Sequence, residues 1–232
     1  NTMKYLCENI QGCVMAYTQS DEISLVLIDY QKLTSDAWFD NNVEKMCSIA
    51  ASMATLAFNT AWRKNVDKWA AERIPEWYDG GTNNPDGVDQ NYLKQAEIYT
   101  SRFDRVLFDA RAFNVPKEEV MNCLIWRQQD ATRNSIQSAG QANFSHKQLM
   151  GKSCNEIQDM LFTEKGINWN DYPTSCKRGT CCIKKPLTFD AKDSRGKVVG
   201  ICSRNKWVID TEIPIFNREP NYINSRVFVG DV

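Results

Sequence analysis

The chain opens with apolar residues at helical intervals. Their spacing predicts a helix over residues 2–11, with one side buried and Gly12 near its end. The apolar positions are Met3, Leu6, Cys7 and Ile10. Because Asn1 already precedes this helix directly and is not an initiator methionine, we expect a further segment upstream of it.

Two β-prone runs follow, at 13–17 and 22–29, and a short polar stretch separates them. Two such runs with a polar connection are typical of a β-hairpin, whose tip would present Ser20, Asp21 and Glu22 together. Hairpin tips are commonly polar, so the pattern by itself fits an ordinary acidic turn. Adjacent carboxylates also suit Mg²⁺, which takes oxygen ligands.

The rest of the chain alternates helical and strand-like patterns. Helical spacing predicts a helix from Asp40 to about Lys64, with helical character that can continue through Trp69 to Arg73, until Pro75 stops it. Turn-forming residues predict an exposed loop over 79–90. Further expected elements are a strand at 105–113, a helix from Pro116 to about Gln137, a capped helix from Ser153 to Gly166, and strands at 180–184, 198–202 and 207–213.

This order of elements predicts an α+β fold. With one more strand upstream, it gives a ferredoxin-like βαββαβ sheet with flanking helices, of the kind that also serves as a polymerase palm. The upstream strand would be its first and central strand. We expect a palm-like catalytic domain over 1–145, and a C-terminal helix and strands over 146–232 that pack on it as part of a single catalytic unit.

The composition is that of a globular chain. Its 232 residues, 42% of them hydrophobic, can bury a core, and no run approaches the roughly 18 apolar residues of a membrane helix. Nine cysteines without a CxxC pair, and a single histidine, lack the spacing of a structural zinc site and favour reduced thiols in a cytoplasmic protein. A net charge of −1 argues against non-specific coating of nucleic acid but allows local basic patches.

Three further clusters of polar residues are candidates for binding. They are Arg127, Asp130 and Asn134 on the long helix, Lys177 and Arg178 before the strand at 180–184, and Lys45 on the helix after the hairpin. The first set has the spacing at which helical side chains meet, as surface ion pairs also do. Two cations beside a glycine suit a phosphate, although many solvated turns share the pattern. An isolated helix lysine is usually just exposed.

Taken together, these motifs resemble the tRNA-histidine guanylyltransferase family, polymerases that add nucleotides to RNA in the 3′-to-5′ direction. The similarity runs in order over most of residues 3–185. The motifs are Tyr17-Thr18-Gln19-Ser20-Asp21-Glu22, Ser52, Phe108-Asp109-Ala110-Arg111, Trp126-Arg127-Gln128-Gln129-Asp130 and Lys177-Arg178-Gly179-Thr180.

The resemblance implies a role for each candidate. Asp21 matches the second of two metal-binding aspartates, and Glu22 lies beside it as a further catalytic carboxylate. Residues that match nucleotide or triphosphate contacts are Ser20, Lys45, Arg127, Asp130 and Asn134. Lys177 and Arg178 match a basic pair near RNA phosphates.

The reaction that the resemblance implies is the addition of GTP or another nucleoside triphosphate to the 5′ end of tRNA, as guanylylation of histidine tRNA or as 5′-end repair. ATP or GTP would activate the 5′-monophosphate. The 3′-hydroxyl of an incoming GTP would then attack the activated end, or a 5′-triphosphate, and release AMP or pyrophosphate. Two Mg²⁺ ions would assist. The resemblance also implies a cytoplasmic homo-oligomer, a tetramer, without a membrane segment.

Two departures from the family pattern modify these expectations. The first metal-binding aspartate, in an Asp-Gly motif, would lie upstream of Asn1, so the chain as given supplies one metal ligand. Thr132 stands where eukaryotic members have a histidine that reads the tRNA, which favours the broader guanylyltransferase-like proteins. A catalytically inactive RNA-binding or assembly paralogue and a palm-type nucleotide cyclase remain as alternatives. Residues 186–232 contain no motif that indicates a function.

Overall fold

A computed structural model describes residues 1–74 and 90–229. By internal packing the chain divides into two units: unit 1 is Asn1–Leu6 with Phe39–Phe113, and unit 2 is Cys7–Trp38 with Asn114–Val232. Both sides of the domain boundary expected after residue 145 lie in unit 2. The loop expected over 79–90 falls outside the described residues, apart from its last residue.

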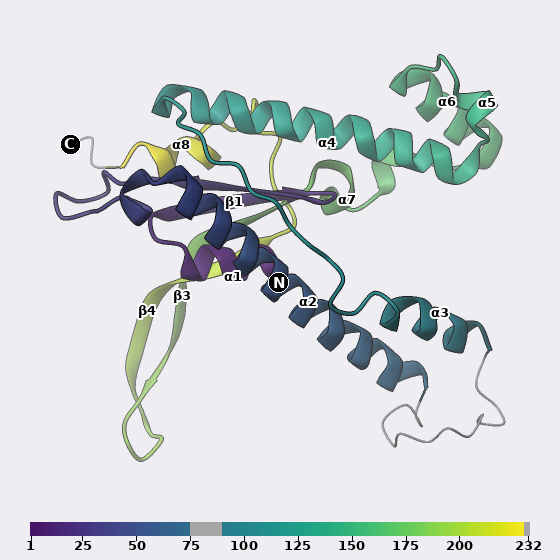
Figure 1. Cartoon of the computed structure of the whole chain (residues 1–232). Helices are drawn as coiled ribbons and strands as arrows, with labels where there is room; N and C mark the ends of the chain where they lie inside the picture. The colour runs from purple at the N-terminus through teal and green to yellow at the C-terminus, as the bar shows by residue number, and fades with distance from the viewer. Residues whose placement is uncertain (75–89, 230–232) are drawn as a thin grey trace. The chain divides into compact units, whose positions relative to one another are not determined.

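Unit 2 contains a four-stranded antiparallel sheet with strand order β2-β1-β3-β4 (Figure 1). β1 (Cys13–Gln19) and β2 (Glu22–Leu27) form the predicted hairpin. β3 (Thr180–Lys192) and β4 (Val198–Asp210) form a second, longer one. β4 is a single strand where the sequence predicted two, because its pairing with β3 continues without a break between them.

One apolar core joins this sheet to two helices. α4 (Val120–Asn143), which follows the 3₁₀ turn η3 (Lys117–Glu119), and α8 (Asn221–Val227) pack with β1 and β3. Burial of each large apolar side chain contributes about 1.5–3 kcal/mol. The core consists of Met15, Tyr17, Leu124, Ala131, Cys181, Ile183, Ile213, Phe216, Ile223 and Val227.

The C-terminal half of α4 carries a smaller cluster with α6 (Cys154–Lys165). Around it lie three short helices, α5 (His146–Leu149), η4 (Trp169–Asp171) and α7 (Thr174–Arg178). α6 begins and ends as the sequence predicts: Ser153 and Glu156 form a capping box, and Gly166 closes the helix at φ +66°.

Unit 1 is helical in its described part. α2 (Val43–Arg73) confirms the long helix expected there, with Asn42 as its N-cap after the 3₁₀ turn η1 (Trp38–Asn41). α3 (Gln90–Thr100) packs on it through aromatic rings; the centroids of Trp69 and Tyr99 are 5.2 Å apart. The first helix, α1 (Thr2–Asn9), begins in unit 1 and ends in unit 2.

The strand expected over 105–113 is absent: this described segment has no regular secondary structure and pairs with no strand. Side chains of α2 take its backbone hydrogen bonds instead. Asn59 donates to the carbonyl of Val106 at 2.8 Å, and the amide of Phe108 donates to the hydroxyl of Thr55 at 3.0 Å. An apolar, β-prone run predicts an extended backbone but not the partner that satisfies it.

The predicted α+β class, an antiparallel sheet with flanking helices, is confirmed. Among the helices of the described ranges, none combines the length and the apolar composition needed to cross a bilayer.

Gly179 allows a test of the close contact between β1 and the residue that precedes β3. It has φ +84° and ψ −166°, and a Cβ there would lie 2.5 Å from the carbonyl oxygen of Thr18. Gly179→Ala should therefore lose about 1–3 kcal/mol to backbone strain and a further 1–3 kcal/mol to overlap, as measured by urea denaturation. Gly196→Ala is the control, because Gly196 has φ +80° but open space around it. Equal losses in both variants would contradict the close approach.

Candidate functional site

The tip of the first hairpin is a two-residue turn. Gln19 pairs with Glu22 across it, so only Ser20 and Asp21 lie between the strands. Ser20 has a left-handed backbone, φ 49°, and both turn residues are exposed. Within the described part of the chain, the carboxylate of Asp21 has no ion pair or hydrogen bond, so both of its oxygens face solvent unpaired.

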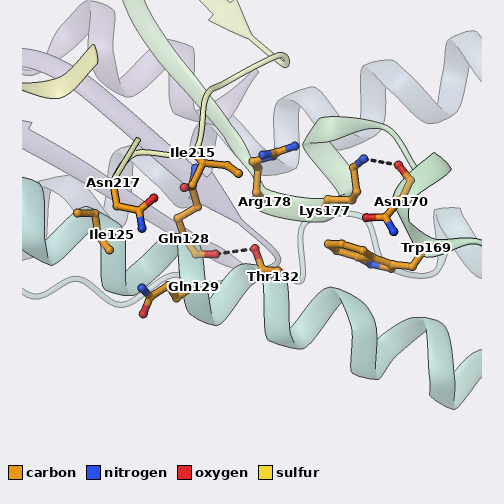
Figure 2. A pocket seen from close by; sticks show the side chains of 10 residues that line it. All are labelled: Ile125, Gln128, Gln129, Thr132, Trp169, Asn170, Lys177, Arg178, Ile215 and Asn217. Carbon is orange, nitrogen blue, oxygen red and sulfur yellow. Dashed lines mark hydrogen bonds between the residues drawn. The ribbon is translucent and has the colours of Figure 1, made fainter. Parts of the chain in front are cut away.

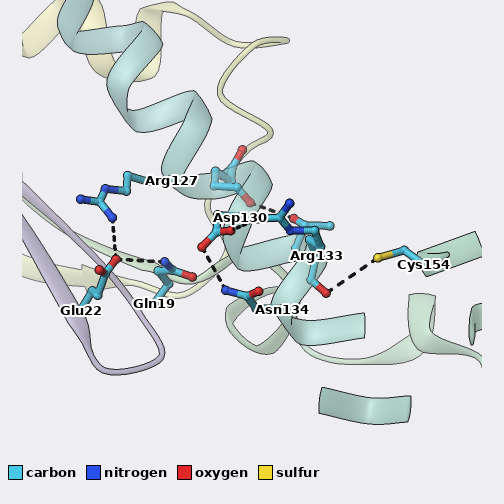
Figure 3. A network of polar contacts seen from close by, with 9 residues as sticks. Gln19, Glu22, Arg127, Asp130, Arg133, Asn134 and Cys154 are labelled. Carbon is cyan, nitrogen blue, oxygen red and sulfur yellow. Dashed lines mark hydrogen bonds and ion pairs between the residues drawn. The ribbon is translucent and has the colours of Figure 1, made fainter. Parts of the chain in front are cut away.

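Glu22 connects this tip to α4. Nη1 of Arg127 donates to Oε2 of Glu22 at 2.7 Å, and Gln19 donates to the same oxygen at 3.3 Å (Figure 3). The Arg127 and Glu22 side chains are 41% and 51% exposed, so water screens the pair and it contributes at most about 1 kcal/mol to stability. Its main effect is geometric, because it holds the polar tip against the helix.

Asp130 lies one turn further along α4 and is the centre of a second polar group. Arg133 and Asn134 both donate to its carboxylate, the latter at 3.0 Å. The hydrogen bond from Arg133 lowers the pKa of Asp130, and bonds from Asn134 and Gln19 add to this effect. The structure thus brings Glu22, Arg127, Asp130 and Asn134 into one region, as Figure 3 shows.

The basic pair lies at the end of α7, where the chain enters β3. Tyr17 donates its hydroxyl to the carbonyl of Arg178 at 2.7 Å, and burial raises the pKa of Tyr17, so the hydroxyl keeps its proton. Lys177 donates to the carbonyl of Asn170, and its ammonium lies 5.9 Å from the centre of the Trp169 ring. Nε of Arg178 is buried without a hydrogen-bond partner among the described residues.

Both basic residues line a pocket of about 380 Å³ between α4, α7 and the segment before α8 (Figure 2). Its walls combine apolar side chains with amides, a hydroxyl and the two cations. The lining residues are Ile125, Gln128, Gln129, Thr132, Trp169, Asn170, Lys177, Arg178, Ile215 and Asn217. Such a mixture of flat apolar walls and a few polar groups is typical of small-ligand sites.

The sequence patterns described above include Gln128, Gln129, Thr132, Lys177 and Arg178 but do not predict that they line one pocket. Gln128, for example, is 5% exposed and bonds the carbonyl of Pro214 at 2.9 Å and the amide of Phe216 at 2.9 Å, and nothing in the sequence connects these positions. The one available signal is the Trp169-Asn170 pair shortly before Lys177. The pocket uses a different side of α4 from Arg127 and Asp130, so one helix serves two polar sites.

Lys45 lies on α2, which belongs to unit 1. Its ammonium is 4.4 Å from the centre of the Phe39 ring, and its amide donates to the Asn42 side chain that caps the helix. Its match to a triphosphate contact stays a prediction.

The chemistry of the tip fits a shared magnesium ion better than a preformed metal site. The described residues contain no group of three His, Cys, Asp or Glu side chains that could hold a metal. Mg²⁺, however, is often held by one or two carboxylates together with substrate phosphates. Asp21 offers an unpaired carboxylate for that arrangement, whereas Arg127 already occupies Glu22.

Comparison with known proteins identifies one family. The family model described as tRNAHis guanylyltransferase matches residues 1–116. A probable tRNA(His) guanylyltransferase of Dictyostelium discoideum is 21% identical over 225 residues, covering 92% of this chain and 72% of that protein.

Two solved structures of bacterial tRNA(His) guanylyltransferase-like proteins are also similar. The one in complex with ATP has a TM-score of 0.68 and 38% identity, covering 98% of this chain and 76% of the other. The one in complex with GTP has a TM-score of 0.62 and 32% identity, covering 98% and 75%.

The hydrogen bond to Arg133 makes a prediction about pH. Arg133→Gln should move the pKa of Asp130 upward, so the variant carboxylate takes up its proton at a higher pH than the wild type. Any stability that the ionised carboxylate contributes is present above its unfolded pKa, and the variant should lose it earlier on acidification. Carbon-detected NMR titration of the Asp carboxyl groups measures this.

The control is Arg111→Gln, which removes a cation from the highly exposed pair with Asp109. It should leave the Asp130 titration unchanged. An unchanged Asp130 pKa in Arg133→Gln would contradict the assigned cause.

Proposed function

Because the chain belongs to the tRNAHis guanylyltransferase family, whose members are nucleotidyltransferases, we propose that it adds GTP or another nucleoside triphosphate to the 5′ end of tRNA. The observation that carries the proposal is the 2.7 Å contact between Glu22 and Arg127, which holds the exposed Asp21 beside the polar face of α4. The ATP and GTP complexes of the bacterial relatives support the choice of nucleotides.

The side chains of this region have complementary tasks in the proposal. Asp21 is the catalytic metal ligand, and Glu22 is the second catalytic carboxylate, oriented by Arg127. Mg²⁺ held there with the triphosphate would neutralise charge and polarise the phosphorus under attack. Asp130 fixes the position of Asn134, which together with Ser20 and Arg127 contacts the nucleotide. Lys45, on α2, is a further candidate contact for the triphosphate, as the family resemblance implies.

The pocket on the other side of α4 is assigned to the RNA. Lys177 and Arg178, which both line this pocket, supply two positive charges for phosphate. The ring of Trp169 supplies a flat apolar wall on which a base can stack.

Thr132 gives a reason to propose broad selection of tRNA. Its hydroxyl donates to the carbonyl of Gln128 at 3.0 Å in the same helix. Because its proton is already used in this bond, the hydroxyl is poorly suited to donate a hydrogen bond to a base. We therefore favour 5′-end repair in the 3′-to-5′ direction over strict selection of histidine tRNA. The proposal includes two Mg²⁺ ions, a cytoplasmic location and a tetramer, as the family resemblance implies.

Removing one carboxylate charge at the tip tests the catalytic assignment. Asp21→Asn in the full-length protein should lower the rate of GTP incorporation into a 5′-truncated tRNA by about 10²-fold or more, because the metal ligand loses its charge. The free energy of unfolding should change by less than about 0.5 kcal/mol, since Asp21 is exposed.

Asp29→Asn is the matched control. Asp29 is also exposed, lies just after β2, and should tolerate the same change with full activity. Near-normal incorporation by Asp21→Asn would remove the site from the proposal.

The template requirement separates this function from the alternatives. A truncated tRNA should be extended only when a template base stands opposite the added position, as measured by sequencing-gel analysis of the 5′ end. A cyclic product from GTP alone would indicate a cyclase, and tRNA binding without any extension would indicate an inactive paralogue. Either result contradicts the proposed function.

A further inference from the structure

The β3–β4 hairpin extends well beyond the sheet (Figure 1). β1 pairs with β3 only from Thr180 to Ile183, whereas β3 and β4 stay paired as far as Lys192 and Val198. Beyond Ile183 this is a two-stranded ribbon, and no third strand from residues 1–74 or 90–229 pairs with it. Of its described side chains from Lys184 to Lys206, only those of Phe189, Ala191 and Cys202 are half-buried, and the others are exposed.

Such a ribbon has no core of its own. Isolated two-stranded hairpins are only marginally stable in water, so packing within the chain does little to stabilise this long exposed ribbon. We therefore ask what it could bind. Its composition indicates the kind of partner. Residues 184–207 contain seven Lys or Arg and two Asp, while the whole chain has a net charge of −1. This local excess of positive charge marks the ribbon as a surface for an anionic partner.

The register concentrates cations on one face. Directly opposite residues of an antiparallel pair share a face, and the register pairs Lys185 with Lys206 and Leu187 with Arg204. Phe189 lies on the same face. Lys206 and Arg204 are 5.3 Å and 5.6 Å from the centre of its ring. We call this set, Lys185, Leu187, Phe189, Arg204 and Lys206, the cationic face.

Two charges of the cationic face are uncompensated. Lys185 is paired with Asp210 at 3.0 Å, but neither Arg204 nor Lys206 has an ion pair with any carboxylate in the described ranges. Like charges directly opposite each other destabilise a sheet, so the Lys185–Lys206 pair works against the ribbon's own stability. An anion bound between the charged ends of the Lys185 and Lys206 side chains would relieve that repulsion.

We propose that the cationic face of the β3–β4 ribbon binds the phosphate backbone of the RNA substrate, through Arg204 and Lys206. The proposal rests on the proposed function, which supplies the RNA. Two-stranded ribbons are elements that proteins lay along nucleic acids, and phosphate contacts of this kind add affinity without reading sequence. The ribbon thereby serves as a second anchor for tRNA, in addition to the pocket that Lys177 and Arg178 line.

A second copy of the chain is the less suitable partner for this face. Two-fold assembly through it would place two copies of the same positively charged patch against each other, because an isologous interface uses the same patch on both copies. RNA has the opposite charge along its whole backbone.

Direct binding measurements test the proposal. In the full chain, Arg204→Gln/Lys206→Gln should weaken binding of a fluorescently labelled tRNA, without added nucleotide, by about tenfold at moderate salt. The slope of log K against log salt should fall by roughly two, about one for each phosphate that the variant no longer neutralises. The charge-preserving Arg204→Lys/Lys206→Arg should retain most of the affinity.

The matched control is Lys184→Gln/Lys197→Gln, which removes the same charge from the same ribbon but off the cationic face. Lys184 stacks on Trp207, 4.9 Å from its ring centre, on the opposite side. This control double variant should change the affinity for tRNA by less than about twofold. Equal weakening by both double variants would show that only net charge matters and would overturn the proposal.

Three further outcomes separate this proposal from the proposed function. If the cationic-face variant keeps its tRNA affinity but changes its mass in light scattering, the face is an interface between copies and the proposal is wrong. If tRNA binding responds as expected but no nucleotide is ever added, the ribbon proposal stands and the proposed function fails. Unchanged affinity with intact nucleotide addition would overturn the ribbon proposal and leave the proposed function standing.

Discussion

In unit 2, Tyr17 and Arg178 are 161 positions apart in the chain, yet the hydroxyl of one bonds the carbonyl of the other at 2.7 Å. This contact exists because Gly179 has no side chain. A Cβ at that position would overlap the backbone of β1. β3 can therefore begin alongside β1, and four residue pairs are enough to anchor the second hairpin to the first. The end of α7, with its two cations, is fixed beside the central strand by the same junction.

α4 carries polar side chains on two of its sides. One side faces the hairpin tip, where Arg127 holds Glu22 and leaves Asp21 unpaired. Another side closes the pocket that also contains Lys177 and Arg178. The negative tip suits a metal ion that arrives with a triphosphate, and the positive pocket suits RNA. In the proposed function, the spacing of residues on one helix would keep these two ligands apart, since side chains three, four or seven positions apart share a face of a helix.

The sequence predicts local features of this fold better than long-range ones. The first hairpin, the long helix α2 and the Ser153–Glu156 capping box follow from periodicity and cap chemistry, which depend on neighbouring residues. The strand expected over 105–113 was wrong because pairing depends on distant partners, and side chains of α2 took its hydrogen bonds instead. The site divides in the same way. Motif residues at the tip and on α4 do lie together, but the pocket depends on Gln128 binding a segment 86 residues away.

The central claim is that the tip of the first hairpin, with α4, holds a metal ion together with a nucleoside triphosphate. Paramagnetic Mn²⁺ in place of Mg²⁺ tests this directly, because it broadens the NMR signals of nuclei near the bound ion. With GTP present, Mn²⁺ should broaden the amide signals of Ser20, Asp21 and Glu22 and those near Arg127, and it should do so much less without GTP. Broadening that is centred elsewhere in the chain, or a response at the tip that is identical in Asp21→Asn, would contradict the account.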